Sequence, residues 1–503
     1  MGVNMRQCCH LGVMLFLVSF ITTLSKADEW LHIETPNFVV YSQDDEATTV
    51  EFVKELERYR QFLVQVAGIS PQGKALKLTV YIAANKSSYR KLTASKSAGM
   101  FNTKRNGPTA IIYQKRKQGR YGQDSLQVLF HEYVHYLQYQ GTPAPYPMWY
   151  QEGLAEYLSS VRSIKGGMQA GEILLARVPD LYGQDWYHVK KLFEAKKVLK
   201  NGYIFYAQSW LMTHMLYSHE TFRPGRTRFL ELLATGTEPL DALQQVYGMT
   251  YSTFDFALRE YFKGRKFPAF QFASEEPNFQ LSKSRILSVN DGELLDLEIA
   301  TEFYRKDRDM RRLLKRVRKQ AKKAKEKRPY KVFEAQLLAD MGNWNDAESI
   351  ARLLVQEELT NYSHFALAGE FILRNELKRQ TSLGEWDLTA PAIVEARNLL
   401  EKAVGMNPKN ARARRWLAAS YVTGENVKQY DAAEQVIREA YALYPQYRPI
   451  RNQYAYLMNA KKKFVAACNL FRPLYRTAYG EKEKTQLKKT IEKMPGGLSA
   501  CPL

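Results

Sequence analysis

The stretch His131-Glu132-Tyr133-Val134-His135 contains the residues of this sequence with the clearest capacity for chemistry. Residues four apart share one face of a helix, so the two imidazoles can bind a single metal ion. The glutamate after the first histidine then lies beside that ion, where a carboxylate can take a proton from a water molecule. The spacing therefore predicts a catalytic metal site on a helix, with one zinc ion as the expected cofactor.

A third protein ligand is needed, because catalytic zinc usually takes three and leaves the fourth position to water. A third histidine on the same helix is excluded, since Gln138 and Gly141 stand where the glycine and histidine of such a site would fall. The next candidates are Glu152 and Glu156, one turn apart on a second predicted helix. The proline-rich turn at 143–147 lets this second helix fold back beside the first.

The pattern W-x-x-E-G-L-A that begins at Trp149 resembles the second zinc helix of gluzincin metallopeptidases. The likeness is to the peptidase-MA-like domains of exported bacterial proteins and, more distantly, to aminopeptidase-N-like and thermolysin-like enzymes. It implies that Glu152 is the third metal ligand, beside His131 and His135. Glu156 is the alternative, as a ligand or as a group that orients one, and Glu152 could also serve only to stabilise the helix N-terminus.

The same resemblance implies a second catalytic residue in addition to Glu132. The segment that begins at Tyr206 is similar to the Y-x-x-G-x-x-x-L helix of the aminopeptidase-like enzymes, in which the tyrosine hydroxyl stabilises an oxyanion. Ser209 stands where that family has glycine, and the alternative for Tyr206 is a core aromatic. By contrast, we expect the lone histidines His188 and His214 to be structural.

The resemblance also bears on which peptides are cleaved. Aminopeptidase-like relatives use a G-x-M-E-N segment to hold a free N-terminus, whereas residues 98–102 read Ala-Gly-Met-Phe-Asn and lack that glutamate. An endopeptidase is therefore expected. We expect the strand at 109–113 to be the edge strand on which an extended peptide substrate docks through backbone hydrogen bonds.

The elements that must position these residues form an α+β region followed by an all-α region. Alternating apolar residues predict strands, and apolar residues at helical spacing predict helices. The expected N-terminal elements are strands at 31–34, 37–42, 76–82 and 109–113, a helix at 46–66 and mostly helical structure from 125 to 263. The patterns thus predict an α+β catalytic domain, and the resemblance to gluzincins implies that it is zincin-like.

The C-terminal part shows an internal repeat. Residues 396–408 and 433–445 superpose at a shift of 37, and they resemble tetratricopeptide repeats. The aligned pairs are Ala396 with Ala433, Leu400 with Ile437, Ala403 with Ala440 and Met406 with Leu443. Further hairpins are expected at 332–359 and around 464–474, with an irregular helical bundle as the alternative. Such repeats bury their apolar faces only against one another, so we expect a stacked array that binds a protein partner.

These patterns give seven segments along the chain. They are a signal peptide at 1–27, an N-terminal α+β lobe at 28–120, a helical zinc-binding lobe at 121–267, an irregular linker at 268–300, a basic helix at 301–330, tetratricopeptide-like repeats at 331–490 and a tail at 491–503.

The N-terminus predicts export. Arg6 precedes an apolar run at 11–24, and Ser25-Lys26-Ala27 offers small residues for signal cleavage. The alternative is an uncleaved membrane anchor, although a run of 14 residues is shorter than the roughly 20 that span a bilayer. We expect a periplasmic or secreted protein. Cys468 and Cys501 would then be the only cysteines left, either bridged or as two free thiols.

The net charge of +21 is concentrated in one segment. Arg305 to Arg328 contains 14 basic and three acidic residues, with apolar residues at helical spacing between them. This pattern predicts a basic amphipathic helix, either as a solvated face or as a surface for an anionic envelope partner. The segment has no interleaved aromatics that would stack on bases, so no nucleic-acid partner is expected.

Together the motifs predict an exported zinc-dependent peptidase with helical repeats for partner or substrate binding. The alternative is an envelope scaffold without catalytic activity, in which the repeats bind a protein and the zinc site is structural. The glutamate at position 132 favours the peptidase, because a structural site needs no base beside the metal.

Overall fold

The structure is a computed structural model that describes the chain from Glu29 to Cys501 with several gaps. The described ranges are 29–65, 75–104, 107–114, 125–141, 146–182, 185–273, 278–304, 306–384, 386–422, 429–445, 447–476, 478 and 481–501. The predicted signal peptide at 1–27 and most of the proline-rich turn at 143–147 lie outside these residues. Within them, no helix is both long enough and apolar enough to cross a bilayer.

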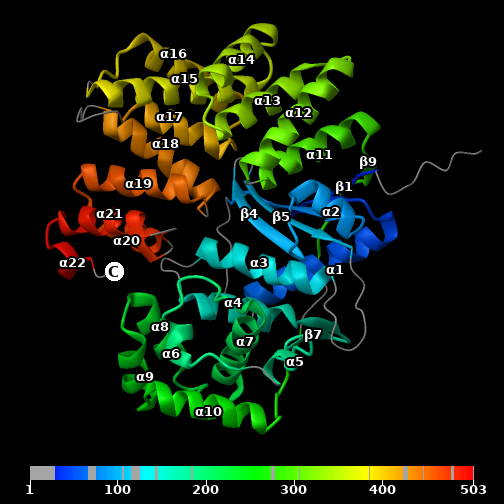
Figure 1. The fold of residues 1–503 in the computed structure, drawn as a ribbon, viewed down its shortest axis with the longest axis vertical. Helices are drawn as coiled ribbons and strands as arrows, with labels where there is room; N and C mark the ends of the chain where they lie inside the picture. Colours follow the sequence, from blue (N-terminus) through cyan, green and yellow to red (C-terminus); the bar gives the residue numbers. More distant parts are fainter. Residues whose placement is uncertain are drawn as a thin grey trace, which may run out of the picture.

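A six-stranded sheet forms the N-terminal lobe, in the order β4-β5-β3-β2-β1-β9 (Figure 1). Strands β2, β3 and β5 are parallel, and β4, β1 and β9 pair antiparallel with their neighbours. The strands are β1 (Leu31–Glu34), β2 (Phe38–Ser42), β3 (Leu78–Ala83), β4 (Gly99–Lys104), β5 (Gly107–Tyr113) and β9 (Arg285–Ile286). The four predicted strands are therefore present, with boundaries shifted by at most two residues.

Both faces of this sheet are covered, as the alternation of side chains on β3 shows. Val80 and Ile82 belong to the core shared with α1 (Glu46–Gln65) and α3 (Ser125–Gly141). Tyr81 and Ala83 face the opposite way, into a smaller core with α2 (Lys86–Thr93) and α11 (Val289–Phe303). Helix α11 lies where an irregular linker at 268–300 was predicted. Its apolar residues are needed because the second face of the sheet would otherwise be exposed.

Strand β5 was predicted to be the edge strand, and this prediction is wrong. The sheet places β5 between β4 and β3, and β4 occupies the edge. Strand β4 pairs antiparallel with β5 from Gly99 opposite Ile112 to Lys104 opposite Gly107. Its sequence, GMFNTK, contains a single β-branched residue, which is why the pattern did not identify it as a strand.

A second lobe of helices lies on the other side of α3 (Figure 1). It contains α4 (Met148–Ser159), α5 (Val178–Leu181), α6 (Val189–Phe193), α7 (Gly202–Ser218), α8 (Arg226–Thr235), α9 (Pro239–Tyr247) and α10 (Tyr251–Lys263). This region also holds an antiparallel three-stranded sheet that was not predicted, made of β6 (Arg162–Ile164), β7 (Gly167–Ala170) and β8 (Phe270–Ala273).

The C-terminal half is an array of helical hairpins that curves over the sheet lobe (Figure 1). The helices are α12 (Asp307–Lys323), α13 (Arg328–Asp340), α14 (Trp344–Glu357), α15 (Tyr362–Leu383), α16 (Pro391–Met406), α17 (Ala411–Ser420), α18 (Tyr430–Leu443), α19 (Arg448–Ala460), α20 (Phe464–Arg476), α21 (Glu481–Glu492) and α22 (Gly497–Ala500). Hairpins α13/α14 and α19/α20 match the predictions at 332–359 and 464–474.

The predicted repeat corresponds to α16 and α18. Its small and branched residues are fully buried in both helices, at Ala396, Leu400 and Ala403 and at Ala433, Ile437 and Ala440. Helix α16 also packs closely on α15, since a Cβ added to Gly369 would lie 2.6 Å from Leu400 Cγ. The helical repeats are therefore confirmed.

Leu76 attaches the array to the sheet lobe. Its backbone N–H donates to the carbonyl of Leu443 at the end of α18 (2.8 Å), and its own carbonyl accepts from the Tyr136 hydroxyl on α3 (3.0 Å). At the chain terminus, a disulfide joins Cys468 on α20 to Cys501, as the export prediction allowed. The predicted C-terminal tail is thereby held against the array.

Candidate metal centre

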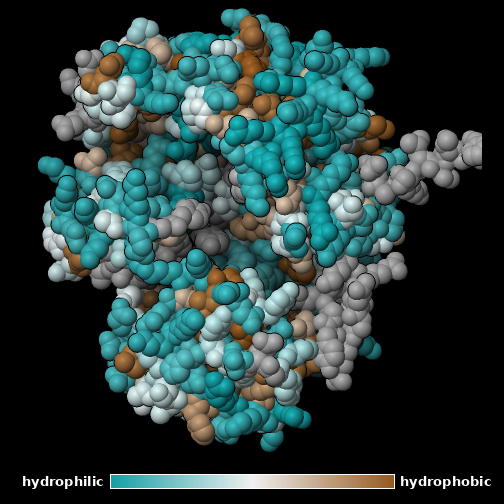
Figure 2. Space-filling model, in the orientation of Figure 1, coloured by the Kyte–Doolittle hydropathy of each residue, from teal (hydrophilic) through white to brown (hydrophobic). Residues whose placement is uncertain are grey.

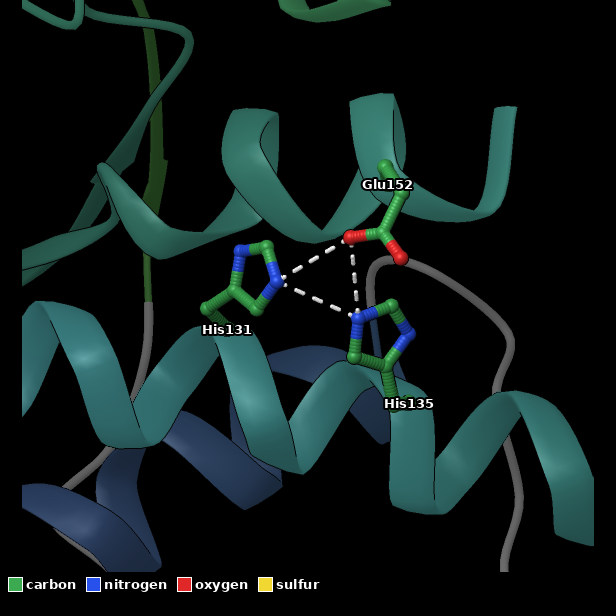
Figure 3. A group of neighbouring side chains, drawn as sticks. All are labelled: His131, His135 and Glu152. Carbon is green, nitrogen blue, oxygen red and sulfur yellow. Dashed lines mark hydrogen bonds and ion pairs between the residues drawn. The ribbon is translucent and has the colours of Figure 1, made fainter. Parts of the chain in front are cut away.

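Helices α3 and α4 pack together and supply the three residues predicted to bind metal (Figure 3). On α3, the residues Val128, Leu129, Phe130, Tyr133, Val134 and Leu137 are buried, so the remaining face carries both histidines and Glu132. Tyr59 of α1 links the two helices, because its hydroxyl donates to the carbonyls of Phe130 (3.4 Å) and Leu158 (3.2 Å).

His131, His135 and Glu152 point toward one another (Figure 3). The two Nε2 atoms are 3.1 Å apart, and Glu152 Oε2 lies 3.3 Å from each of them. Ligands about 2.0 Å from a tetrahedral ion lie about 3.3 Å from one another. The three atoms therefore form a triangle of the size that one zinc ion requires, and Glu152 Oε2 is a buried oxygen with no hydrogen-bond partner. The residues present fit a zinc ion.

The other nitrogen of each imidazole has its own partner. His131 Nδ1 lies 3.4 Å from Glu156 Oε1, and His135 Nδ1 lies 3.3 Å from Gln138 Oε1. An acceptor at Nδ1 holds the proton there and leaves the Nε2 lone pair for a metal. Of the two carboxylates considered as third ligand, Glu152 thus faces both histidines, whereas Glu156 is placed to orient one of them.

Arg177 holds Glu156 in this position. Its Nε and a terminal nitrogen lie 3.0 and 2.6 Å from the two carboxylate oxygens, and Glu156 has only 1% of its side chain exposed. Burial acts to raise the pKa of Glu156, but Arg177 and then His131 outweigh it and lower that pKa to about 2. The negative charge that orients His131 is therefore stable at neutral pH.

The two carboxylates also change the protonation of the metal-free site. Burial acts to lower the pKa of His131, yet Glu152 and Glu156 together raise that pKa to about 10. Burial likewise acts to raise the pKa of Glu152, but the two neighbouring histidines outweigh it and bring that pKa well below the usual range. In the metal-free protein His131 is therefore protonated at neutral pH.

Glu132 lies beside the triangle and next to the edge strand. The backbone N–H of Phe101 on β4 faces its carboxylate and acts to lower the pKa of that carboxylate. Burial raises the pKa of Glu132, the two histidines oppose this, and Glu152 adds to it, with a net upward shift. A carboxylate with a raised pKa is better suited to accept and release a proton than an ordinary surface glutamate.

Tyr206 of α7 borders the same site. Its ring centroid is 6.2 Å from that of His131, and the Arg177 guanidinium lies 5.1 Å from the Tyr206 ring. Burial and the charges of Glu152 and Glu156 raise the pKa of the Tyr206 hydroxyl, so it keeps its proton at neutral pH. The structure therefore places this tyrosine at the site, and its oxyanion role stays a prediction.

Gly153 explains how α4 comes close enough to α7. A Cβ on Gly153 would lie 2.3 Å from the carbonyl oxygen of Ser209 and 2.4 Å from Thr213 Oγ1. Any larger residue would push the helices apart and move its neighbour Glu152. The family pattern has glycine at position 209, but here the close approach needs glycine only on the α4 side.

The two histidines expected to be structural lie outside the triangle. His214 is fully buried, with Nδ1 2.7 Å from the Tyr261 hydroxyl and Nε2 2.9 Å from the Gly171 carbonyl. His188 caps α6 by accepting from Lys190 N (3.3 Å). Both predictions are confirmed.

Sequence reasoning missed the roles of Gln138, Gly153 and Arg177. In the sequence, Gln138 served only to exclude a zinc site with a third histidine on the same helix, and its contact with His135 was not predicted. Arg177 had no signal in the sequence, because it lies in a short irregular segment 21 residues after its partner Glu156.

No family model matches this chain, and no curated protein matches it either. Among solved structures, the chain is similar to TTC0263, a thermophilic TPR protein of Thermus thermophilus, at 17% identity and a TM-score of 0.28 over 40% of this chain and 94% of that one. It is also similar to MamA, at 14% identity and a TM-score of 0.24 over 35% of this chain and 92% of that one.

Proposed function

We propose that this protein is a zinc-dependent endopeptidase of the gluzincin type. The observation that carries the proposal is the triangle of His131 Nε2, His135 Nε2 and Glu152 Oε2, with edges of 3.1 to 3.3 Å and Glu132 beside it. The side chains of His131 and His135 keep 16% and 13% of their surface exposed. The two imidazoles are therefore not fully enclosed, as a catalytic centre that admits water requires.

A bound zinc ion would supply Lewis-acid chemistry, lowering the pKa of a water molecule and polarising the scissile carbonyl. Glu132 accepts the proton that the attacking water loses, and it later donates that proton to the nitrogen of the leaving amine. The Tyr206 hydroxyl, which keeps its proton, donates a hydrogen bond to the oxygen on which negative charge develops. Glu156 and Gln138 keep the two imidazoles in position throughout.

The edge strand β4 offers a place for the substrate backbone. Edge strands have unpaired N–H and C=O groups, and an extended peptide can add to them as a further strand. The influence of the Phe101 backbone on Glu132 places the base next to this edge. A peptide on β4 would thus pass directly beside the base. This is the docking role that was predicted for the strand at 109–113, transferred to the strand that lies at the edge.

We also propose that the protein acts outside the cytoplasm. The Cys468–Cys501 disulfide supports this location, because disulfides persist in oxidising compartments.

The experiment compares the wild type with Glu132→Gln, in zinc content and in cleavage of an unfolded protein. The expected result is equal zinc in both proteins and at least a hundredfold slower cleavage in the variant. Equal cleavage by both proteins would contradict the proposed mechanism.

A second candidate function is a protein-binding scaffold. The array of helical hairpins favours it, and the comparisons with known proteins favour it more than the peptidase. A cavity of about 480 Å³ on the array, lined among others by Phe333, Tyr362 and Arg412, would receive part of a protein partner. If the wild type binds zinc but shows no cleavage that is lost in Glu132→Gln, the result would favour the scaffold over the peptidase.

A further inference from the structure

One face of α12 carries a row of six basic residues, which we call the basic row. They are Arg311, Arg312, Lys315, Lys319, Lys322 and Lys323, and all six are exposed. Their spacing of three and four residues places them on one side of the helix, over a length of about 18 Å. Figure 2 shows hydrophilic side chains gathered over α11 to α13, the region that includes this helix.

The opposite face of α12 fixes the orientation of the basic row. Met310, Leu313, Leu314 and Val317 are buried in the core of the array. The helix therefore cannot turn its apolar side outward or insert it into a bilayer. The row lies along the outward side of the helix, and any partner must be held by electrostatic attraction.

Much of this charge has no counter-charge on the protein. Arg311 lies 2.7 Å from Asp307 and Arg312 lies 3.9 Å from Asp309. No ion pair involves the four lysines of the row within the described part of the chain. The pairs 315–319 and 319–323 even place like charges four residues apart, which destabilises a helix.

Some basic residues of the array have acidic partners. Arg352 on α14 contacts Glu348 and Glu395, and Lys461 after α19 contacts Asp431 and Glu434. A single glutamate between the lysines of α12 would have had the same effect. The basic row instead gathers several unneutralised charges along one helix face, where they can act together on a partner with negative charge.

We propose that the basic row binds the surface of a bilayer that contains acidic phospholipids. A straight row of exposed charges on the outward side of a helix can meet a planar array of acidic headgroups along its whole length, and each lysine or arginine near such a surface adds to the attraction. The row has no aromatic residue to stack on bases. This proposal does not depend on the metal centre, so it can be correct or wrong whatever the outcome for the proposed peptidase.

The test is co-sedimentation of the full-length mature protein with vesicles of phosphatidylglycerol and phosphatidylcholine, at low and high salt. The variant Lys315→Gln/Lys319→Gln/Lys322→Gln removes three charges and keeps good helix formers. The control variant Lys482→Gln/Lys488→Gln/Lys489→Gln removes three exposed lysines from α21 and has the same net charge. Circular dichroism is the control that checks whether both variants are folded.

We expect the wild type and the control to bind acidic vesicles, and the α12 variant to bind about a hundredfold more weakly. Binding should vanish at about 0.5 M salt, because screening shortens the reach of surface charges. Equal weakening of both variants would show that only net charge matters and would overturn the proposal. Binding to heparin or polyglutamate without binding to acidic vesicles would overturn it too, in favour of a polymeric partner.

Discussion

The pair of Glu156 and Arg177 gives a sharp test of how the site is held. Replacing Glu156 by Gln keeps an acceptor near His131 Nδ1 but leaves the Arg177 guanidinium, whose side chain is only 14% exposed, without its counter-charge. Removing one partner of a buried ion pair costs about 3–5 kcal/mol. Arg177→Gln leaves Glu156 charged with only His131 as its cationic neighbour, so a loss in the same direction but no larger is expected.

The double variant Glu156→Gln/Arg177→Gln should lose much less than the sum of the two single losses, because two neutral amides replace two charges. Urea unfolding of the metal-free proteins measures the three free energies, and their double-mutant cycle gives the coupling. Zinc competition titration gives a second readout. We expect a 10- to 100-fold loss of affinity for Glu156→Gln, since it weakens the group that orients a ligand. Additive unfolding losses with unchanged zinc affinity would refute this account.

Three further predictions concern packing, pH and catalysis. Gly153→Ala should destabilise the fold by about 1–3 kcal/mol in urea unfolding, because its Cβ meets α7, whereas Gly405→Ala, which has open space, should not. Zinc affinity should fall about tenfold per pH unit on acidification below neutral, because the raised pKa of His131 means that zinc must displace a proton; an affinity independent of pH in a competition titration would contradict this. Tyr206→Phe should retain zinc but slow peptide cleavage about 10²- to 10³-fold, and unchanged cleavage would assign Tyr206 to the core.

The sequence predicted the parts of the fold that have strong local patterns. The alternation around Val80 and the helical spacing from Glu46 onward identified β3 and α1, and the apolar repeat at Ala396 and Ala433 identified helices of the array. Each of these patterns arises because one side of the element is buried. Their boundaries therefore agree with the structure to within a few residues.

The missed elements depend on contacts that are distant in the chain. Strand β4 has few strand-forming residues, and its position at the edge is set by pairing with β5. Helix α11 covers a sheet face whose strands come mostly from the start of the chain, and the Asn102 side chain donates to the carbonyl of Glu302, 200 residues later. Neither contact leaves a local pattern.

The residues of the candidate site likewise fall into those that a local sequence pattern identified and those that only distant contacts reveal. His131, Glu132 and His135 could be identified from their spacing, because the chemistry itself requires it. Glu152 was found by resemblance and by the need for a third ligand. Arg177 acts only through Glu156, and Gln138 only through His135, so nothing in their local sequence marked them.

The most direct test of the metal centre is a crystal structure of the zinc-loaded protein with anomalous scattering data collected at the zinc edge. The account predicts one anomalous peak about 2.0–2.2 Å from His131 Nε2, His135 Nε2 and a Glu152 carboxylate oxygen. A peak elsewhere, or no peak with zinc in excess, would contradict it.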